Sequence, residues 1–315
     1  MFFENKKVLV TGGAGVIGRE LIRLLADQKA HVRCIDFLEK PEMLNALNVE
    51  YYRLDLSDDR NQFLFAPSGG FMPEYVFHLA ADFERSEETE TFWEFNFRNN
   101  VMASHNTLRS AMESPALKKI VFASSYLIYN KDLYYSEGVE ANCLSEHTEI
   151  DPRNMCGIAK LQTERDLEFL GSLNDFKHAS ARIFRVYGQG SRDVISRWIR
   201  SAIRNEEITV FNEENQFDYI YAGDVARGLL EMAMSDASGV FNLGTGKPTS
   251  IKEIVATLQE LFNNEIKVIN ENHSIYPEAS YACMKKTEKQ IGWLPQTTVR
   301  DGIQKIIQYE REKTC

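Results

Sequence analysis

The stretch that decides the fold is Lys7-Val-Leu-Val-Thr11, which runs directly into Gly12-Gly-Ala-Gly-Val-Ile-Gly18. The valine-rich run predicts a buried strand, and the amphipathic pattern over residues 16–28 predicts a helix directly after the glycines. Such a loop needs glycine for three reasons: the turn is tight, the backbone must contact a pyrophosphate, and the helix packs closely against the strand. The free N–H groups and positive dipole end of the helix attract phosphates. This unit predicts a dinucleotide site that includes Gly12, Gly15, Val16 and Ile17.

Asp36 ends the next expected strand, eighteen residues after Gly18. An acidic side chain at this place accepts hydrogen bonds from the ribose hydroxyls and repels a 2′-phosphate. The cofactor is therefore expected to be NAD(H) rather than NADP(H). Arg33 on the same strand is expected to face the same side as Asp36, which leaves some tolerance for NADP(H).

Short β-branched runs alternate with amphipathic stretches through the first two-thirds of the chain. This alternation predicts βαβ crossovers and an α/β fold with a Rossmann-like, doubly wound parallel sheet. The expected strands are residues 7–11, 31–36, 50–54, 75–79, 119–123 and 178–184. The expected helices are residues 16–28, 91–113 and 152–170, with a short helix and a loop within 57–73.

After residue 185 the expected helices, 193–205, 224–234, 251–263 and 299–310, alternate with short strands, which predicts a smaller C-terminal α+β lobe. The expected dinucleotide-binding domain is 1–184, with 217–247 returning to it. Residues 185–216 and 248–315 then form the substrate lobe. The cleft between the two is the default ligand site.

The composition excludes several classes of protein. With 36 basic and 46 acidic residues and a net charge of −10, the chain lacks the basic surface of a nucleic-acid binder. Its five cysteines show no C-x-x-C pair, so neither a zinc site nor a disulfide framework is expected. The sequence contains no run of eighteen apolar residues, so no membrane span is predicted. We expect a cytoplasmic protein without a metal.

Further motifs follow the glycine loop in a fixed order. They are Asp55-Leu56, His78-Leu79-Ala80-Ala81, Asn100-Val101, Ala123-Ser-Ser125, Val186-Tyr-Gly188, Asp218-Tyr-Ile-Tyr221 with Asp224, and Phe241-Asn-Leu-Gly-Thr-Gly246. This order resembles the extended short-chain dehydrogenases/reductases, the family of nucleotide-sugar epimerases, dehydratases and reductases. The resemblance implies NAD as the cofactor and a nucleotide sugar as the substrate. It also places Asp55, Leu56, Leu79, Ala80, Ala81, Asn100 and Lys160 at the cofactor.

In that family a Tyr-x-x-x-Lys pair on one helix and a Ser or Thr after the fifth strand assist hydride transfer. Asp151-Pro152 is the expected helix start, and the helix carries Cys156-Gly-Ile-Ala-Lys160. Lys160 and Ser125 match the family pattern, but Cys156 stands where the tyrosine belongs. Tyr126-Leu127 follows Ser125, where the sugar 4,6-dehydratases have Asp-Glu, so that reaction is not expected.

Three interpretations of Cys156 remain open. Its thiol beside Lys160 is partly ionised and acts as the base, although it is shorter than a phenol and needs a water or a closer substrate. Alternatively, the phenol of Tyr126 takes over the proton transfer. Or Cys156 is an inert packed residue, natural in a weakened enzyme or introduced to disable one.

The substrate end departs from the family pattern as well. Two arginines that bind the substrate diphosphate in the family are replaced by Phe217 and, approximately, Tyr276. Arg185 stands where Asn is common, and Arg192, Arg197 and Arg200 follow it; one of them can hold an anion, or they are solvated surface charges. Glu84 with Glu87-Glu88 either frames the sugar pocket or forms a solvated loop. His78 is expected to be structural or near the cofactor.

The helices at 91–113 and 152–170 match those that pair across a two-fold axis in the family, and Trp93 and Phe97 share one face. They suit burial in a homodimer or in the monomer's own core. Two functions remain. The first is an NAD(H)-dependent enzyme that oxidises, reduces or epimerises a hydroxyl-bearing carbon of a nucleotide sugar, using Ser125, Lys160 and either Cys156 or Tyr126. The second is a catalytically silent NAD(H)-binding sensor or partner protein.

Overall fold

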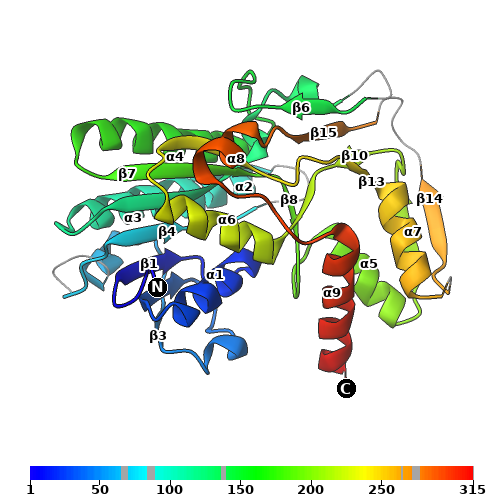
Figure 1. Cartoon of the computed structure of the whole chain (residues 1–315), viewed down its shortest axis with the longest axis horizontal. Coiled ribbons are helices and arrows are strands. Elements are labelled where there is room, and N and C mark those ends of the chain that lie inside the picture. The colour runs from blue at the N-terminus through cyan, green and yellow to red at the C-terminus, as the bar shows by residue number, and fades with distance from the viewer. Residues whose placement is uncertain (65–69, 84–88, 136–139, 264, 272–276, 315) are drawn as a thin grey trace.

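A seven-stranded, entirely parallel sheet forms the centre of the protein (Figure 1). The computed structural model describes residues 1–64, 70–83, 89–135, 140–263, 265–271 and 277–314. The six strands expected in the first two-thirds are confirmed, with ends that move by two residues or fewer. In spatial order the strands are β12 (Gly239–Leu243), β7 (Lys177–Ile183), β5 (Lys119–Ser125), β4 (Tyr75–His78), β1 (Lys7–Thr11), β2 (His31–Asp36) and β3 (Val49–Arg53).

Helices cover both faces of this sheet, which gives three layers and explains why strands such as β1 and β4 are almost entirely buried. On one face lie α1 (Val16–Asp27) and α6 (Ala222–Met234), which pack against each other and against the sheet. On the other face lie α3 (Ala103–Met112) and α4 (Met155–Leu173). The strand order reverses between β1 and β4, so the carboxyl ends of these two strands form the switch point where such sheets bind ligands.

The expected helix 91–113 is present but not uniform. It consists of α2 (Glu90–Asn96), a π-helical turn η4 (Phe97–Met102) and α3. The expected start of α4 at Asp151-Pro152 is wrong. The helix begins at Met155, because the side-chain oxygen of Asn154 accepts a hydrogen bond of 2.9 Å from the Gly157 N–H and caps the first turn.

A second lobe has its own apolar core, built largely from isoleucines of three helices. These helices are α5 (Val194–Ile203), α7 (Ile251–Leu261) and α9 (Val299–Thr314), on the right of Figure 1. The lobe's small sheets pair β8 (Arg185–Tyr187) with β11 (Tyr219–Tyr221) and β9 (Ile208–Phe211) with β14 (Val268–Glu271). A third joins β13 (Thr249–Ser250), β10 (Gln216–Phe217), β15 (Ala279–Ala282) and β6 (Asn142–Leu144).

Within the segment 217–247, only part rejoins the dinucleotide-binding layers. Helix α6 and strand β12 do so, whereas β10 and β11 stay in the small sheets. The short elements are η1 (Glu42–Leu44), η2 (Asp59–Leu64), η5 (Tyr126–Ile128), η6 (Lys131–Tyr134) and α8 (Lys285–Ile291). Within the described residues, no helix has both the length and the apolarity needed to cross a membrane.

Candidate active site

The glycine loop and the segment after β4 meet at the switch point of the sheet. Gly12 follows β1 with a φ of +75°, and a Cβ atom there would lie 2.5 Å from the backbone nitrogen of Ala80. The Leu79 N–H donates to the Thr11 carbonyl over 3.0 Å, which holds the two chain segments together. The predicted residues Leu79 and Ala80 therefore lie directly against the glycine loop.

The first turn of α1 is suited to the pyrophosphate of a dinucleotide. Gly15 is its N-cap, no side chain caps it, and its first turn contains no acidic residue. Its first N–H groups, including those of Val16 and Ile17, have no carbonyl partner within the helix, and the positive end of the helix dipole lies at the same place. The residues present therefore fit the expected cofactor.

Asp36 lies beside the glycine loop and is almost fully buried. Its two carboxylate oxygens accept hydrogen bonds of 2.8 Å from the N–H groups of Ala14 and Leu38. The expectation for Arg33 is wrong, because three positions separate it from Asp36 and the two side chains project from opposite faces of the strand. Arg33 instead pairs with Glu50 over 2.8 Å and lies over the ring of Phe71.

The other predicted cofactor residues make contacts within the protein. Asp55 accepts hydrogen bonds from Ser57 and, over 3.1 Å, from Arg98, and Leu56 is buried. Asn100 is buried within η4, and its amide is used in the protein itself. It accepts from the Asp82 N–H over 2.7 Å and donates to the Asp82 carbonyl over 2.8 Å. Asn100 thereby positions the segment that includes Ala81.

His78 has a structural role. Its ring nitrogens lie 2.7 Å from the Thr11 hydroxyl and 2.8 Å from the Ser104 hydroxyl. Burial, with a smaller contribution from the Lys160 charge, lowers the pKa of His78 to about 3. The ring is therefore neutral at physiological pH and ties β4 to β1 and α3.

Three of the four predicted catalytic residues lie at the carboxyl end of β5 and on the first turns of α4. Ser125 ends β5, and its hydroxyl accepts a hydrogen bond of 3.2 Å from the Leu127 N–H. Cys156 and Lys160 are both buried and lie one turn apart on α4. The Lys160 ammonium donates to the Ala123 carbonyl over 2.7 Å.

The charge of Lys160 is tuned by its surroundings. Burial lowers the pKa of Lys160 to about 8, while Cys156 and Glu164 on the same helix act in the raising direction. A lysine in this range exchanges protons near neutral pH, which is typical of lysines at reacting centres. The two charge partners of Lys160, Cys156 and Glu164, lie four residues before and four residues after it on α4, and Cys156 makes the larger raising contribution.

Tyr126, the fourth predicted catalytic residue, points into a different cluster. Its ring stacks on Phe184, with 5.0 Å between the ring centroids, and contacts Tyr134 edge-on at 5.5 Å. The charges that act on Lys160 do not include Tyr126. The phenol of Tyr126 instead acts on Arg185 and Arg153.

Comparison with known proteins identifies the family. A model of the NAD-dependent epimerase/dehydratase family matches residues 8–244. This chain belongs to that family. It is an NAD-dependent enzyme of the extended short-chain dehydrogenase/reductase type, as its motifs predict.

Two curated relatives span nearly the whole chain. A putative UDP-glucose 4-epimerase of Methanocaldococcus jannaschii is 28% identical, with 96% of this chain and 97% of the relative covered. A dTDP-4-dehydro-6-deoxyglucose reductase of Escherichia coli is 27% identical, with 97% and 98% covered. Among solved structures, the UDP-glucose 4-epimerase of Thermotoga maritima with UDP-glucose has a TM-score of 0.85 at 26% identity, with 98% and 100% covered.

Next to the phenol of Tyr126 lies an ion cluster that the sequence did not reveal. Arg153 forms two hydrogen bonds, of 2.7 and 2.8 Å, with the carboxylate of Glu278. Arg185 contacts the same carboxylate at 3.4 Å, and its guanidinium carbon lies 3.5 Å from the ring centroid of Phe217. Of the other predicted arginines, Arg200 pairs with Glu310 over 3.0 Å and Arg197 is exposed. Tyr276, Glu84, Glu87 and Glu88 lie outside the described residues.

A buried ion pair lies behind the lysine. Glu164 follows Lys160 by one turn, and its carboxylate accepts from Arg182 over 2.8 Å and from the Ser124 hydroxyl over 2.6 Å. Both charged side chains are 3% exposed. A glutamate or arginine in the sequence usually indicates a solvent-facing side chain, so the sequence did not indicate a buried ion pair. The only indication was that Glu164 follows Lys160 by four residues and therefore lies on the same face of the helix.

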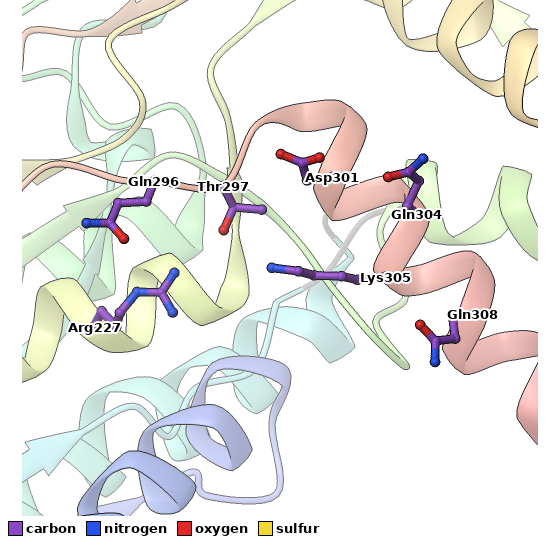
Figure 2. A pocket seen from close by; sticks show the side chains of 7 residues that line it. All are labelled: Arg227, Gln296, Thr297, Asp301, Gln304, Lys305 and Gln308. Carbon is purple, nitrogen blue, oxygen red and sulfur yellow. The ribbon is translucent and has the colours of Figure 1, made fainter.

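A surface cavity of about 550 Å³ lies apart from this site, between α6 and α9 (Figure 2). Arg227 on its α6 side pairs with Asp224, and Lys305 extends from α9 toward α6. None of the predicted catalytic or cofactor residues is in its lining, which consists of Arg227, Gln296, Thr297, Asp301, Gln304, Lys305 and Gln308. Within the described residues, no cluster of His, Cys, Asp and Glu is arranged to hold a metal.

Proposed function

We propose that this protein catalyses NAD(H)-dependent oxidoreduction or epimerisation at a hydroxyl-bearing carbon of a nucleotide-activated sugar. The proposal is carried by the site at the end of β5, where Ser125, Cys156 and Lys160 lie beside the switch point of the sheet. The two curated relatives are named for reactions of a UDP-sugar and a dTDP-sugar, so a nucleoside diphosphate sugar is the class of substrate they share.

The residues divide the work as follows. When bound, NAD would supply the acceptor and the donor of the hydride. Gly12, Gly15 and the first turn of α1 would hold its pyrophosphate, and Asp36 would hold the adenosine ribose. Lys160 would hold the nicotinamide ribose, and Ser125 would orient the substrate hydroxyl. The hydroxyl proton must leave as the carbon is oxidised, so a proton acceptor is needed next to Lys160.

We assign this acceptor to Cys156 together with Lys160. The lysine pKa of about 8 places proton release from the amine near neutral pH, and Cys156 is one of the two charges that act on this amine. Because a thiol is shorter than a phenol, a water bridges it to the substrate hydroxyl. Tyr126 is the less suitable acceptor, because its phenol lies among Phe184, Tyr134 and the arginines.

The second candidate function is a catalytically silent NAD(H)-binding sensor or partner protein. The 5% exposure of Cys156 favours it, because a buried thiol commonly serves only packing. Retention of Lys160 and Asp36 fits this candidate too, since both hold the cofactor.

Single-turnover absorbance of the nicotinamide, with a panel of nucleotide sugars between pH 6 and 10, separates these functions. With Cys156 as the acceptor, Cys156→Ala should lower hydride transfer by about 10²-fold or more. Tyr126→Phe should then have little effect, and Cys156→Tyr should slow the reaction. A faster Cys156→Tyr variant would instead identify a weakened site, and a severe Tyr126→Phe loss would move the role to Tyr126.

Ser125→Ala is the matched control, because it should leave NAD bound and reduce turnover alone. If no sugar in the panel gives hydride transfer while NAD binds normally, the silent binding protein becomes the better account.

We further propose a homodimer that acts in the cytoplasm. Helices α2 and α4 lie in contact, and together with η4 they carry the exposed apolar side chains Trp93, Phe97, Ile158 and Phe169. The exposure of Trp93 and Phe97, 56% and 53%, removes the alternative that they belong to the monomer's core. Light scattering should show that Trp93→Glu yields monomers while Phe211→Glu, equally exposed on β9, does not. A monomeric wild type would overturn the dimer.

In this proposal residues 1–184, with 217–247, hold the cofactor, and residues 185–216 and 248–315 hold the substrate.

A further inference from the structure

Two cysteines from distant parts of the chain lie close together at the edge of the four-stranded sheet. Cys143 is the middle residue of β6, and Cys283 directly follows β15, the strand beside β6 in Figure 1. The parallel register places Cys143 opposite Tyr281, and the Cys283 N–H donates to the Leu144 carbonyl over 2.8 Å. Because side chains two positions apart on a strand point to the same side, Cys143, Tyr281 and Cys283 share one face of this sheet.

The side chains on this face are in contact. The Cys143 thiol is hydrogen-bonded to the Cys283 thiol and to the Tyr281 hydroxyl. Burial raises the pKa of the Cys143 thiol, and the charge of an ionised Cys283 acts in the same direction. The two groups therefore resist ionising together, and an ionised Cys283 leaves Cys143 as a neutral thiol. One thiolate beside one thiol is the arrangement that thiol–disulfide exchange uses.

This pair also contains the accessible thiols of the described chain. Among the cysteines that the structure describes, Cys34 and Cys156 are buried, whereas Cys143 is exposed and Cys283 is partly exposed. Burial raises the pKa of Cys34 to about 12, so this thiol stays protonated and unreactive. A reagent dissolved in the surrounding water therefore reaches Cys143 and Cys283 before either of the other two.

We propose that Cys143 and Cys283 form a reversible disulfide that holds β6 on β15 when the protein meets a low-molecular-weight disulfide such as glutathione disulfide. The thiolate of Cys283 attacks one sulfur of the reagent, which forms a mixed disulfide and releases the first reagent thiolate. Cys143 then gives its proton to solvent and attacks the Cys283 sulfur, which forms the protein disulfide and releases the second thiolate. Two protein thiols are thus oxidised by two electrons, and one reagent disulfide is reduced to two thiols.

The bond would reinforce a weakly held edge. β6 has three residues and pairs within its sheet with β15 alone. β15 begins directly after Glu278, so the bond also restrains the segment that holds this carboxylate against Arg153. A link between residues 143 and 283 closes a loop of about 140 residues, which strongly restricts the unfolded chain. The inference goes beyond the proposed function and does not depend on it.

Oxidation of the full-length protein with glutathione disulfide, followed by alkylation and mass spectrometry of the denatured chain, tests the proposal. Wild type should lose two alkylated thiols without gaining a glutathione, and digestion should release a peptide that joins Cys143 to Cys283. Cys143→Ser and Cys283→Ser should each stop at a mixed disulfide with one glutathione attached. Cys315→Ser is the matched control and should behave as wild type.

Thermal unfolding measures the link between the strands. The oxidised wild type should melt about 5 °C or more above the reduced protein, in keeping with a disulfide across a long loop, and dithiothreitol should reverse the shift. The double variant Cys143→Ser/Cys283→Ser should show no such shift. A wild type that keeps both thiols, carries two glutathiones or pairs either cysteine with Cys315 would overturn the proposal, and so would equal melting temperatures of the oxidised and reduced protein.

Discussion

Lys160 is a charge that the fold buries, and replacing it with methionine should stabilise the protein while it abolishes turnover. The side chain is 7% exposed, and burial lowers its pKa from 10.5 to about 8. A difference of this size corresponds to about 3 kcal/mol of unfolding free energy lost at neutral pH. Loss of the hydrogen bond to the Ala123 carbonyl removes about 1 kcal/mol of stability. Lys160→Met should therefore gain about 2 kcal/mol at pH 7.

The pH dependence provides a second signature. The unfolded chain keeps the Lys160 proton up to its ordinary pKa of 10.5, whereas the folded protein releases it from about pH 8. Between these values the unfolded state binds more protons, so the contribution of Lys160 to stability rises with pH. The stability gap between Lys160→Met and wild type should thus be constant below pH 8 and shrink toward pH 10.5.

Urea unfolding of both proteins without cofactor, followed by circular dichroism at several pH values from 7 to 10, measures this gap. Lys119→Met is the matched control. Burial lowers the pKa of Lys119 to about 8 as well, but this lysine begins β5 and donates to the carbonyls of Ser235 and Ala237, far from the catalytic end. It should show the same pH window with unchanged turnover. If Lys160→Met is less stable than wild type at pH 7, or its gap does not vary with pH, the reasoning is wrong.

Three other outcomes are expected. Calorimetry should show that NAD(H) binds at least about tenfold more tightly than NADP(H), about 1.4 kcal/mol, and that Asp36→Ala narrows this ratio; equal affinities in the wild type would remove Asp36 from the ribose. Gly12→Ala should weaken NAD binding at least about tenfold, because the added Cβ meets the Ala80 nitrogen at 2.5 Å, whereas Gly292→Ala, with a similar φ and open space, should not. Glu164→Leu leaves Arg182 buried without its partner and should cost about 3–5 kcal/mol in urea unfolding, and a loss below 1 kcal/mol would contradict this reasoning.

The ends of the first strands were predictable, because neighbouring residues in the sequence determine them. The strands at 7–11 and 31–36 have the predicted ends, since a glycine loop bounds the first and Asp36 closes the second. The start of α4 was misplaced for a local reason as well. Asp151-Pro152 has the composition of a helix start, but Asn154 lies three residues before Gly157 and supplies the actual cap.

The ion cluster of Arg153, Arg185 and Glu278 and the ion pair of Glu164 with Arg182 could not be predicted, because they join elements that meet only in the tertiary fold. Arg153 and Glu278 are 125 positions apart. Arg182 meets Glu164 only once β7, the strand that carries Arg182, has joined the sheet beside β5. Comparison with the family pattern shows that Phe217 replaces an arginine. It does not show that the guanidinium of Arg185 lies over the Phe217 ring. Such pairings depend on the tertiary fold and leave no periodic signal in the sequence.

Strand β12 has a consequence for how the chain is made. It completes the edge of the large sheet by pairing with β7, yet residues 184–238 must be synthesised between the two. At about 5–20 residues per second, a ribosome needs about 3–11 s for this segment. Throughout that interval the growing chain carries a parallel strand with one unpaired edge, which is a template for wrong strand pairing. The nascent protein is therefore most vulnerable to aggregation, and most in need of a chaperone, between the emergence of β7 and that of β12.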